Sequence, residues 1–133
     1  MDTSGPHLFR VLLEVSGLDD AVRFYSTLLG TGGRGVGGSR HYFDCGILFG
    51  LVDVAVGGER PRPVPQNVYF ATAELDAIYE RARALGCLSG EDVHGAAGGV
   101  VAVRPWGERS FYGADPFGNK LCFVDETTLF TGQ

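Results

Sequence analysis

Hydrophobic and polar positions follow the same order twice along the chain. Alternation over residues 9–15 predicts a strand, and apolar residues at every third or fourth position over 18–29 predict a helix that ends at Gly30. The order recurs over 67–71 and 75–86, with nearly the same interval between the two strands and between the two helices. A repeat of this kind indicates two similar modules that share one core.

Shorter patterns complete each half. Ser16, three residues before Asp19, matches the capping-box pattern, so we expect Ser16 to cap the first helix. Tight turns at Cys45-Gly46 and at Asp115-Pro116-Phe117-Gly118-Asn119 each lie between two strand patterns. The further strands that we expect are 40–44, 47–54, 110–114 and 121–124, with extended segments over 87–93 and 100–103.

These elements predict an α+β fold of two βαβββ modules in a single domain, residues 1–133. Gly57 to Pro65 contains three prolines and three charged residues, which favour an extended crossover between the modules. We place module one at about 7–54, the linker at about 55–65, module two at about 66–126 and a C-terminal tail at 127–133.

The composition excludes several classes of function. Of the 133 residues 44% are hydrophobic and 20% charged, and the formal charge is −5 without a basic cluster. Nucleic acid is therefore not an expected partner, because its phosphates require basic residues. No apolar run approaches the ~20 residues of a membrane span, and residues 1–10 do not have the pattern of a secretion signal, so we expect a cytoplasmic protein. Cys45, Cys87 and Cys122 have no metal or disulfide spacing.

Several motifs together resemble the vicinal oxygen chelate superfamily, which comprises glyoxalases, bleomycin-resistance proteins and extradiol dioxygenases. The resemblance rests on Val15-Ser16-Gly17-Leu18, Phe24-Tyr25, Leu29-Gly30, Phe43-Asp44-Cys45-Gly46, Pro105-Trp106-Gly107-Glu108-Arg109 and Asp115-Pro116-Phe117-Gly118-Asn119. It implies a curved mixed sheet around a groove, and it is not specific to one activity.

Members that bind a divalent metal take His, Glu or Gln ligands from the first and fourth strand of each module. The repeat puts those positions near Arg10, Gly50, Asn67 and Cys122. A permanent cation, a residue without a side chain and an amide make a poor ligand set, and one thiolate does not suffice. The histidines His7, His41 and His94 fall elsewhere, so we expect no metal and no cofactor.

The remaining groove is apolar with a few polar anchors, which is typical of a small-molecule site. Trp106 either stacks on a planar ligand or serves as a packing residue. Arg10 either binds a carboxylate or phosphate of the ligand or pairs internally with Glu14 or another carboxylate, and we prefer the internal pair. Cys122 is better explained as a core residue than as a nucleophile. The ligand contacts that we expect are Arg10, Glu14, Phe43, Asn67, Tyr69, Trp106, Phe111 and Cys122.

These features favour a metal-independent protein that resembles the bleomycin-resistance branch and sequesters a small, partly aromatic ligand. From the family we expect a homodimer that builds or completes the groove. One alternative is an enzyme, a lyase, isomerase or dioxygenase, with unusual metal ligands or with acid–base catalysis by Glu14, His41 or Glu108. Another is a structural or regulatory module whose groove is filled by its own side chains.

Overall fold

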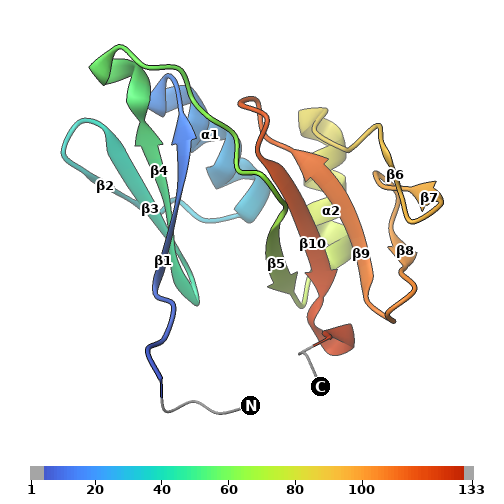
Figure 1. The fold of residues 1–133 in the computed structure, drawn as a ribbon. Coiled ribbons are helices and arrows are strands. Elements are labelled where there is room, and N and C mark those ends of the chain that lie inside the picture. Colours follow the sequence, from blue (N-terminus) through green and yellow to red (C-terminus); the bar gives the residue numbers. More distant parts are fainter. Residues whose placement is uncertain (1–4, 131–133) are drawn as a thin grey trace.

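Two four-stranded mixed sheets, each with one long helix, make up the computed structural model, which describes residues 5–130 (Figure 1). In the first half the sheet order is β1-β4-β3-β2, with β1 parallel to β4 and the other pairs antiparallel. Its elements are β1 (Arg10–Val15), α1 (Leu18–Leu29), β2 (Arg34–Val36), β3 (Arg40–Cys45) and β4 (Ile47–Asp53), followed by a 3-10 turn at Val54–Gly57.

The second half repeats this topology as β5-β10-β9-β8, again with its first strand parallel to its last. Its elements are β5 (Val68–Thr72), α2 (Leu75–Leu85), the hairpin β6 (Asp92–Val93) and β7 (Ala96–Ala97), then β8 (Ala102–Val103), β9 (Arg109–Ala114), β10 (Lys120–Asp125) and a 3-10 turn at Glu126–Thr128. The predicted α+β class with two βαβββ modules is confirmed.

One face of each sheet packs against its helix, and we call the other face the open face. Strand alternation sends Leu13, Phe43 and Leu51 of the first sheet to the helix side, where all three are fully buried. Phe111 and Phe123 do the same in the second sheet. The helices α1 and α2 contact each other, so the two halves share one hydrophobic core.

The start of α1 differs from the prediction. Gly17, with a φ of 76°, is the N-cap residue, and as a glycine it has no side chain that could accept a hydrogen bond from the helix. Instead the Leu18 N–H donates to the Asp53 carboxylate at 3.1 Å. Because Val15 and Asp53 are register partners at the ends of β1 and β4, the capping group comes from a distant strand, and the expectation for Ser16 was wrong.

One other expectation needs correction. The extended segments over 87–93 and 100–103 are reduced to the short strands β6 and β8, because glycines allow the chain between them to turn back. The predicted tail is held to the sheet as far as the structure describes it, since Thr128 accepts from the Arg109 N–H and Phe130 donates to Glu108; residues 131–133 lie outside the described part. No helix within residues 5–130 could cross a membrane.

The turn between β9 and β10 joins the modules through a buried polar network. The Tyr25 hydroxyl, on α1, donates to the Asp115 carboxylate at 2.5 Å, and Asn119 donates to the same carboxylate at 2.8 Å. Asn119 also accepts from the Val64 N–H of the linker at 2.9 Å. Tyr25 and Asn119 are fully buried, and burial raises the pKa of Tyr25, so its hydroxyl stays a donor.

Removal of the Tyr25 hydroxyl therefore tests this junction. Tyr25→Phe keeps the ring and deletes one donor to a buried carboxylate, which we expect to lower the free energy of unfolding by about 1.5–3 kcal/mol. Urea denaturation followed by circular dichroism measures the change. The matched control is Tyr42→Phe, whose hydroxyl only accepts a long bond from Arg40 on the surface and whose loss we expect to be nearly neutral. Equal effects of the two substitutions would contradict the assignment.

Candidate functional site

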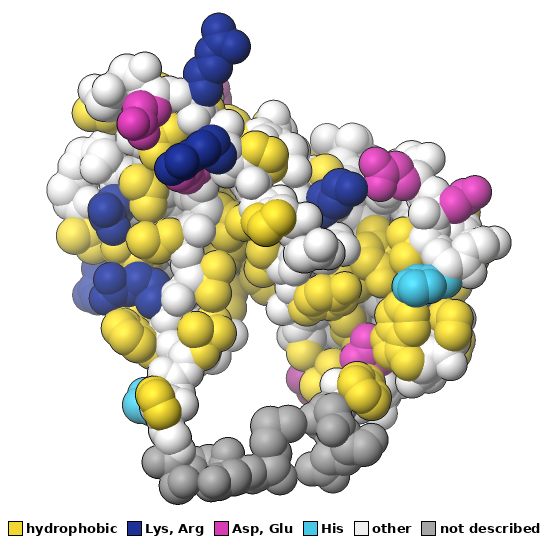
Figure 2. Space-filling model, in the orientation of Figure 1, with side chains coloured by type: hydrophobic (Ala, Val, Ile, Leu, Met, Phe, Trp, Pro, Cys, Tyr) yellow, Lys and Arg dark blue, Asp and Glu magenta, His cyan; other side chains and the backbone are white. Residues whose placement is uncertain are grey.

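The open face of the second sheet carries a groove of about 420 Å³. Figure 2 shows hydrophobic side chains on both sides of the opening between the two halves of the molecule. We call this hollow the Trp106 groove. The residues that line it are Tyr69, Phe70, Ala71, Trp106, Glu108, Val124, Leu129 and Phe130.

Trp106 is held in place by a carboxylate. Its indole N–H donates to one oxygen of Glu108 at 2.6 Å, while the other Glu108 oxygen accepts the Phe130 N–H at 2.8 Å. The His94 ring meets the indole edge-on, with centroids 4.8 Å apart. These contacts fix the orientation of a half-buried aromatic surface at the edge of the groove.

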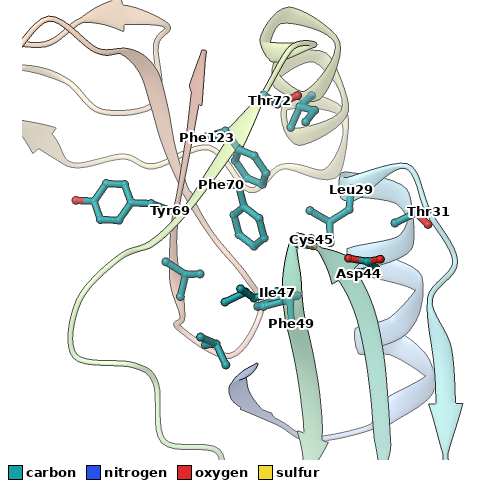
Figure 3. Close-up of a pocket in the computed structure, with 14 residues that line it drawn as sticks. Leu29, Thr31, Asp44, Cys45, Ile47, Phe49, Tyr69, Phe70, Thr72 and Phe123 are labelled. Atoms are coloured by element: carbon teal, nitrogen blue, oxygen red, sulfur yellow. The ribbon is translucent and has the colours of Figure 1, made fainter. Parts of the chain in front are cut away.

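Tyr69 provides a second aromatic side chain. It is 58% exposed, and Figure 3 shows its ring directed away from Phe70 and Phe123, toward the open face. The alternation along β5 explains this, because Phe70 faces the core side and its neighbour Tyr69 faces the other. The structure thus brings together two predicted contacts, Tyr69 and Trp106, and adds Glu108 as the group that holds the indole.

The open face of the first sheet is basic and partly apolar. Arg10 is exposed, and its guanidinium carbon lies 5.0 Å from the Phe9 ring centroid and 5.8 Å from that of Tyr42. Glu14 does not pair with it. Glu14 binds Arg62 of the linker at 3.0 Å, and this hydrogen-bonded cation lowers the pKa of Glu14. The preferred pairing of Arg10 with Glu14 or another carboxylate was therefore wrong, since none of the ion pairs within residues 5–130 involves Arg10.

Two predicted aromatic contacts are core residues. Phe43 and Phe111 are fully buried on the helix side of their sheets, where Phe43 packs near Tyr25 and Phe111 stacks on Phe123. The adjacent tyrosines, Tyr42 and Tyr112, take the open-face positions instead. Phe43 and Phe111 are therefore closed to a ligand that occupies the open face.

Asn67 and Cys122 lie outside the Trp106 groove. Asn67 precedes β5 and lines a separate cleft of about 220 Å³ with Tyr112 and Lys120. Cys122 is 1% exposed, and burial raises its pKa to about 11 despite hydrogen bonds with Ser110 and Tyr112. The thiol is thus neutral at physiological pH and enclosed by its neighbours.

Arg104, which the sequence patterns did not single out, covers the open face of the second sheet near Cys122 and Tyr112. Arg104 is 3% exposed, and its guanidinium donates to the Ser110 hydroxyl at 3.0 Å and to the backbone oxygens of Val100 and Ser110. It also lies 5.0 Å from the Tyr112 ring centroid. Arg104 thereby fastens the preceding loop over Cys122 and Tyr112, a role that depends on loop conformation and so has no periodic signal.

The strand positions that the family resemblance assigns to metal ligands do not fit a divalent ion. Of these positions, Gly50 on β4 lies opposite Leu12 on β1, and Cys122 on β10 lies opposite Tyr69 on β5. A Cβ atom at Gly50 would lie 2.6 Å from the Leu12 side chain and 2.7 Å from the Tyr42 ring, so the position has no room for a ligand side chain. Over residues 5–130, the structure has no group of three His, Cys, Asp or Glu side chains that would hold a metal ion.

Comparison with known proteins identifies the fold. No family model matches the chain, and a search of curated proteins gave no match. Solved structures do match over most of their lengths. A glyoxalase/bleomycin resistance protein from Albidiferax ferrireducens T118 has a TM-score of 0.72 and 23% identity over 89% of this chain and 97% of that one.

Two further similar structures are named as enzymes. Oxidase ChaP-H1 has a TM-score of 0.73 and 21% identity over 97% of this chain and 100% of its own. A lactoylglutathione lyase from Agrobacterium tumefaciens has a TM-score of 0.61 and 22% identity over 92% and 96%. At such identities the likeness carries the architecture and not the chemistry. The chain has the fold of the glyoxalase/bleomycin resistance protein/dioxygenase superfamily, the vicinal oxygen chelate fold.

Proposed function

We propose that the protein binds a small, partly aromatic molecule reversibly in the Trp106 groove, without making or breaking a bond. The observation that carries the proposal is the Trp106 indole, which Glu108 holds beside the exposed Tyr69 ring over an apolar floor. An aromatic surface fixed before binding loses little side-chain entropy when a planar ligand stacks on it. Sequestration requires only this affinity.

The groups considered for acid–base catalysis support binding more than chemistry. Glu14 is engaged by Arg62, the His41 Nε2 atom lies 2.7 Å from the Gly32 carbonyl oxygen, and Glu108 accepts from Trp106 and Phe130. A general base must reach the proton that it abstracts. Each of these three side chains is instead held by a partner within the chain.

A second copy of the chain completes the site in this proposal. The open face of the first sheet presents Phe9, 55% exposed, and Leu12, 40% exposed, beside the cation Arg10. The Trp106 groove presents Tyr69 and the carboxylate of Glu108. Figure 2 shows Lys and Arg side chains gathered over the first sheet. Both surfaces are partly apolar, and they carry opposite charges. These properties support a two-fold dimer in which the first sheet of each copy covers the Trp106 groove of the other copy.

The role of Trp106 is tested with its own fluorescence, because the chain contains one tryptophan. We expect a panel of planar aromatic phenols and carboxylic acids to include compounds that quench this fluorescence and raise the melting temperature. For such a compound, Trp106→Ala should weaken binding about tenfold or more, measured by calorimetry, because the stacking surface is lost. Val103→Ala, an exposed site on β8 outside the groove, is the control. Unchanged affinity in Trp106→Ala would refute the site.

The oligomeric state is tested by placing a charge on the proposed interface. Leu12→Lys should convert a dimer into a monomer in sedimentation equilibrium, because an unpaired ammonium resists burial between the two copies. Val56→Lys, at a position 71% exposed in the turn after β4, should leave the dimer intact. A wild-type protein that sediments as a monomer at all concentrations would contradict the arrangement.

Metal dependence provides an independent check. Because a bound ion adds stability by mass action, we expect EDTA to leave the melting temperature of the purified protein unchanged and zinc, nickel or manganese to leave it unraised. Elemental analysis of the same preparation should find less than one ion per chain. A stoichiometric divalent ion would favour an enzyme over a sequestering protein.

A further inference from the structure

A second cavity borders β5 and shares Tyr69, Phe70 and Ala71 with the Trp106 groove. It has a volume of about 320 Å³ and is formed where β4, β5 and the ends of α1 and α2 approach one another (Figure 3). We call it the inter-module cavity. Besides Tyr69, the apolar residues that line it are Val11, Leu29, Ile47, Phe49, Val68, Phe70, Ala71, Ile78 and Phe123.

Aromatic rings form its wall. Phe49 of the first module meets Phe70 of the second edge-on at 5.2 Å between centroids, and Phe70 stacks on Phe123 at 4.9 Å. Phe123 in turn stacks on Phe111 at 5.4 Å. These rings therefore form a continuous series from the core of the second module across the boundary to the first, and Phe49, Phe70 and Phe123 border the cavity. A ring inserted there has edges and faces of other rings to contact.

Few polar side chains line the cavity. They are Thr31, Asp44, Cys45, Tyr69 and Thr72, and the Asp44 carboxylate already accepts the Gly46 N–H at 3.1 Å. Among residues 5–130, no Lys, Arg or His side chain lines the cavity. An anionic ligand would find no counter-charge there, and water in the apolar part would find no side-chain partner for its hydrogen bonds.

We propose that the inter-module cavity is a second binding site, for a neutral molecule that contains fused or linked aromatic rings. The volume falls at the lower end of the range of ligand pockets, which suits a compact ligand and not a peptide. Phe70 and Tyr69 leave β5 in opposite directions (Figure 3), although both residues line each of the two spaces. Trp106 and Glu108 line the groove and not the cavity, so the second site does not rest on the proposed function of the Trp106 groove.

The neutral fluorophore N-phenyl-1-naphthylamine is a suitable probe, because its emission increases in apolar surroundings. We expect saturable binding of one molecule per chain. Val68→Phe fills the cavity and should weaken binding about tenfold, in the range that added methylene groups produce in apolar pockets. Val36→Phe makes the same change on β2, at a residue that lines no described cavity and is 51% exposed, and should have no effect.

Cys45 provides a readout in the unmodified protein. Cys45 is an exposed residue that lines the cavity, so the bound probe should slow alkylation of its thiol by iodoacetamide several-fold, measured by mass spectrometry of the Cys45 peptide. Cys87, which lines none of the cavities described above, is the internal control, and its rate should not change. This measurement holds even if Val68→Phe does not fold.

Trp106→Ala distinguishes the two sites. Probe binding that persists in Trp106→Ala and is lost in Val68→Phe supports the inter-module cavity. Binding that is lost in Trp106→Ala and persists in Val68→Phe places the probe in the groove and overturns the proposal. Absence of saturable binding, or alkylation of Cys45 at the same rate with and without probe, also overturns it. Binding of half a molecule per chain would place the probe between two copies and would likewise overturn the proposal.

Discussion

The two modules are fixed to each other by one buried carboxylate. Asp115 accepts from the Tyr25 hydroxyl, the Asn119 side chain and the backbone N–H groups of Phe117 and Asn119. These donors satisfy an anion that has no cation as partner among the described residues, so its burial is tolerated. Because Asn119 also holds the linker through Val64, the positions of α1, the linker and the β9–β10 turn are set together, and with them the cavity between the modules.

Periodicity predicted the fold well because each module buries one face of a sheet. The strands β1, β4, β9 and β10 and both helices follow from alternation and helical spacing, which depend on local burial alone. The cap of α1 and the pairing of Glu14 with Arg62 were not predictable in this way. The helix cap depends on Asp53 and the ion pair depends on Arg62 of the linker. Both partners are distant along the chain and come close only after the strands have paired.

The site was predicted less completely for the same reason. Tyr69 and Trp106 do meet in one groove, but Phe43 and Phe111, chosen for their aromatic character, face the helices. Alternation alone would have placed Tyr42 and Tyr112 on the open face in their stead. The burial of Cys122 agrees with its interpretation as a core residue, whereas the burial of Arg104 could not be anticipated, because it depends on how a glycine-rich loop returns across the sheet.

A single strand can serve two sites because its side chains alternate. The β5 strand is at the edge of its sheet, bonded only to β10, so both of its faces border spaces that the chain does not fill. Strand geometry gives Phe70 and Tyr69 opposite directions, while the backbone hydrogen bonds to β10 keep them in register with Phe123 and Cys122. Because Tyr69, Phe70 and Ala71 line both spaces, the width of this one strand separates them, and substitutions of these three residues would change both. Residues that line one space alone, such as Trp106 for the groove and Phe49 for the cavity, are therefore the ones that affect a single site.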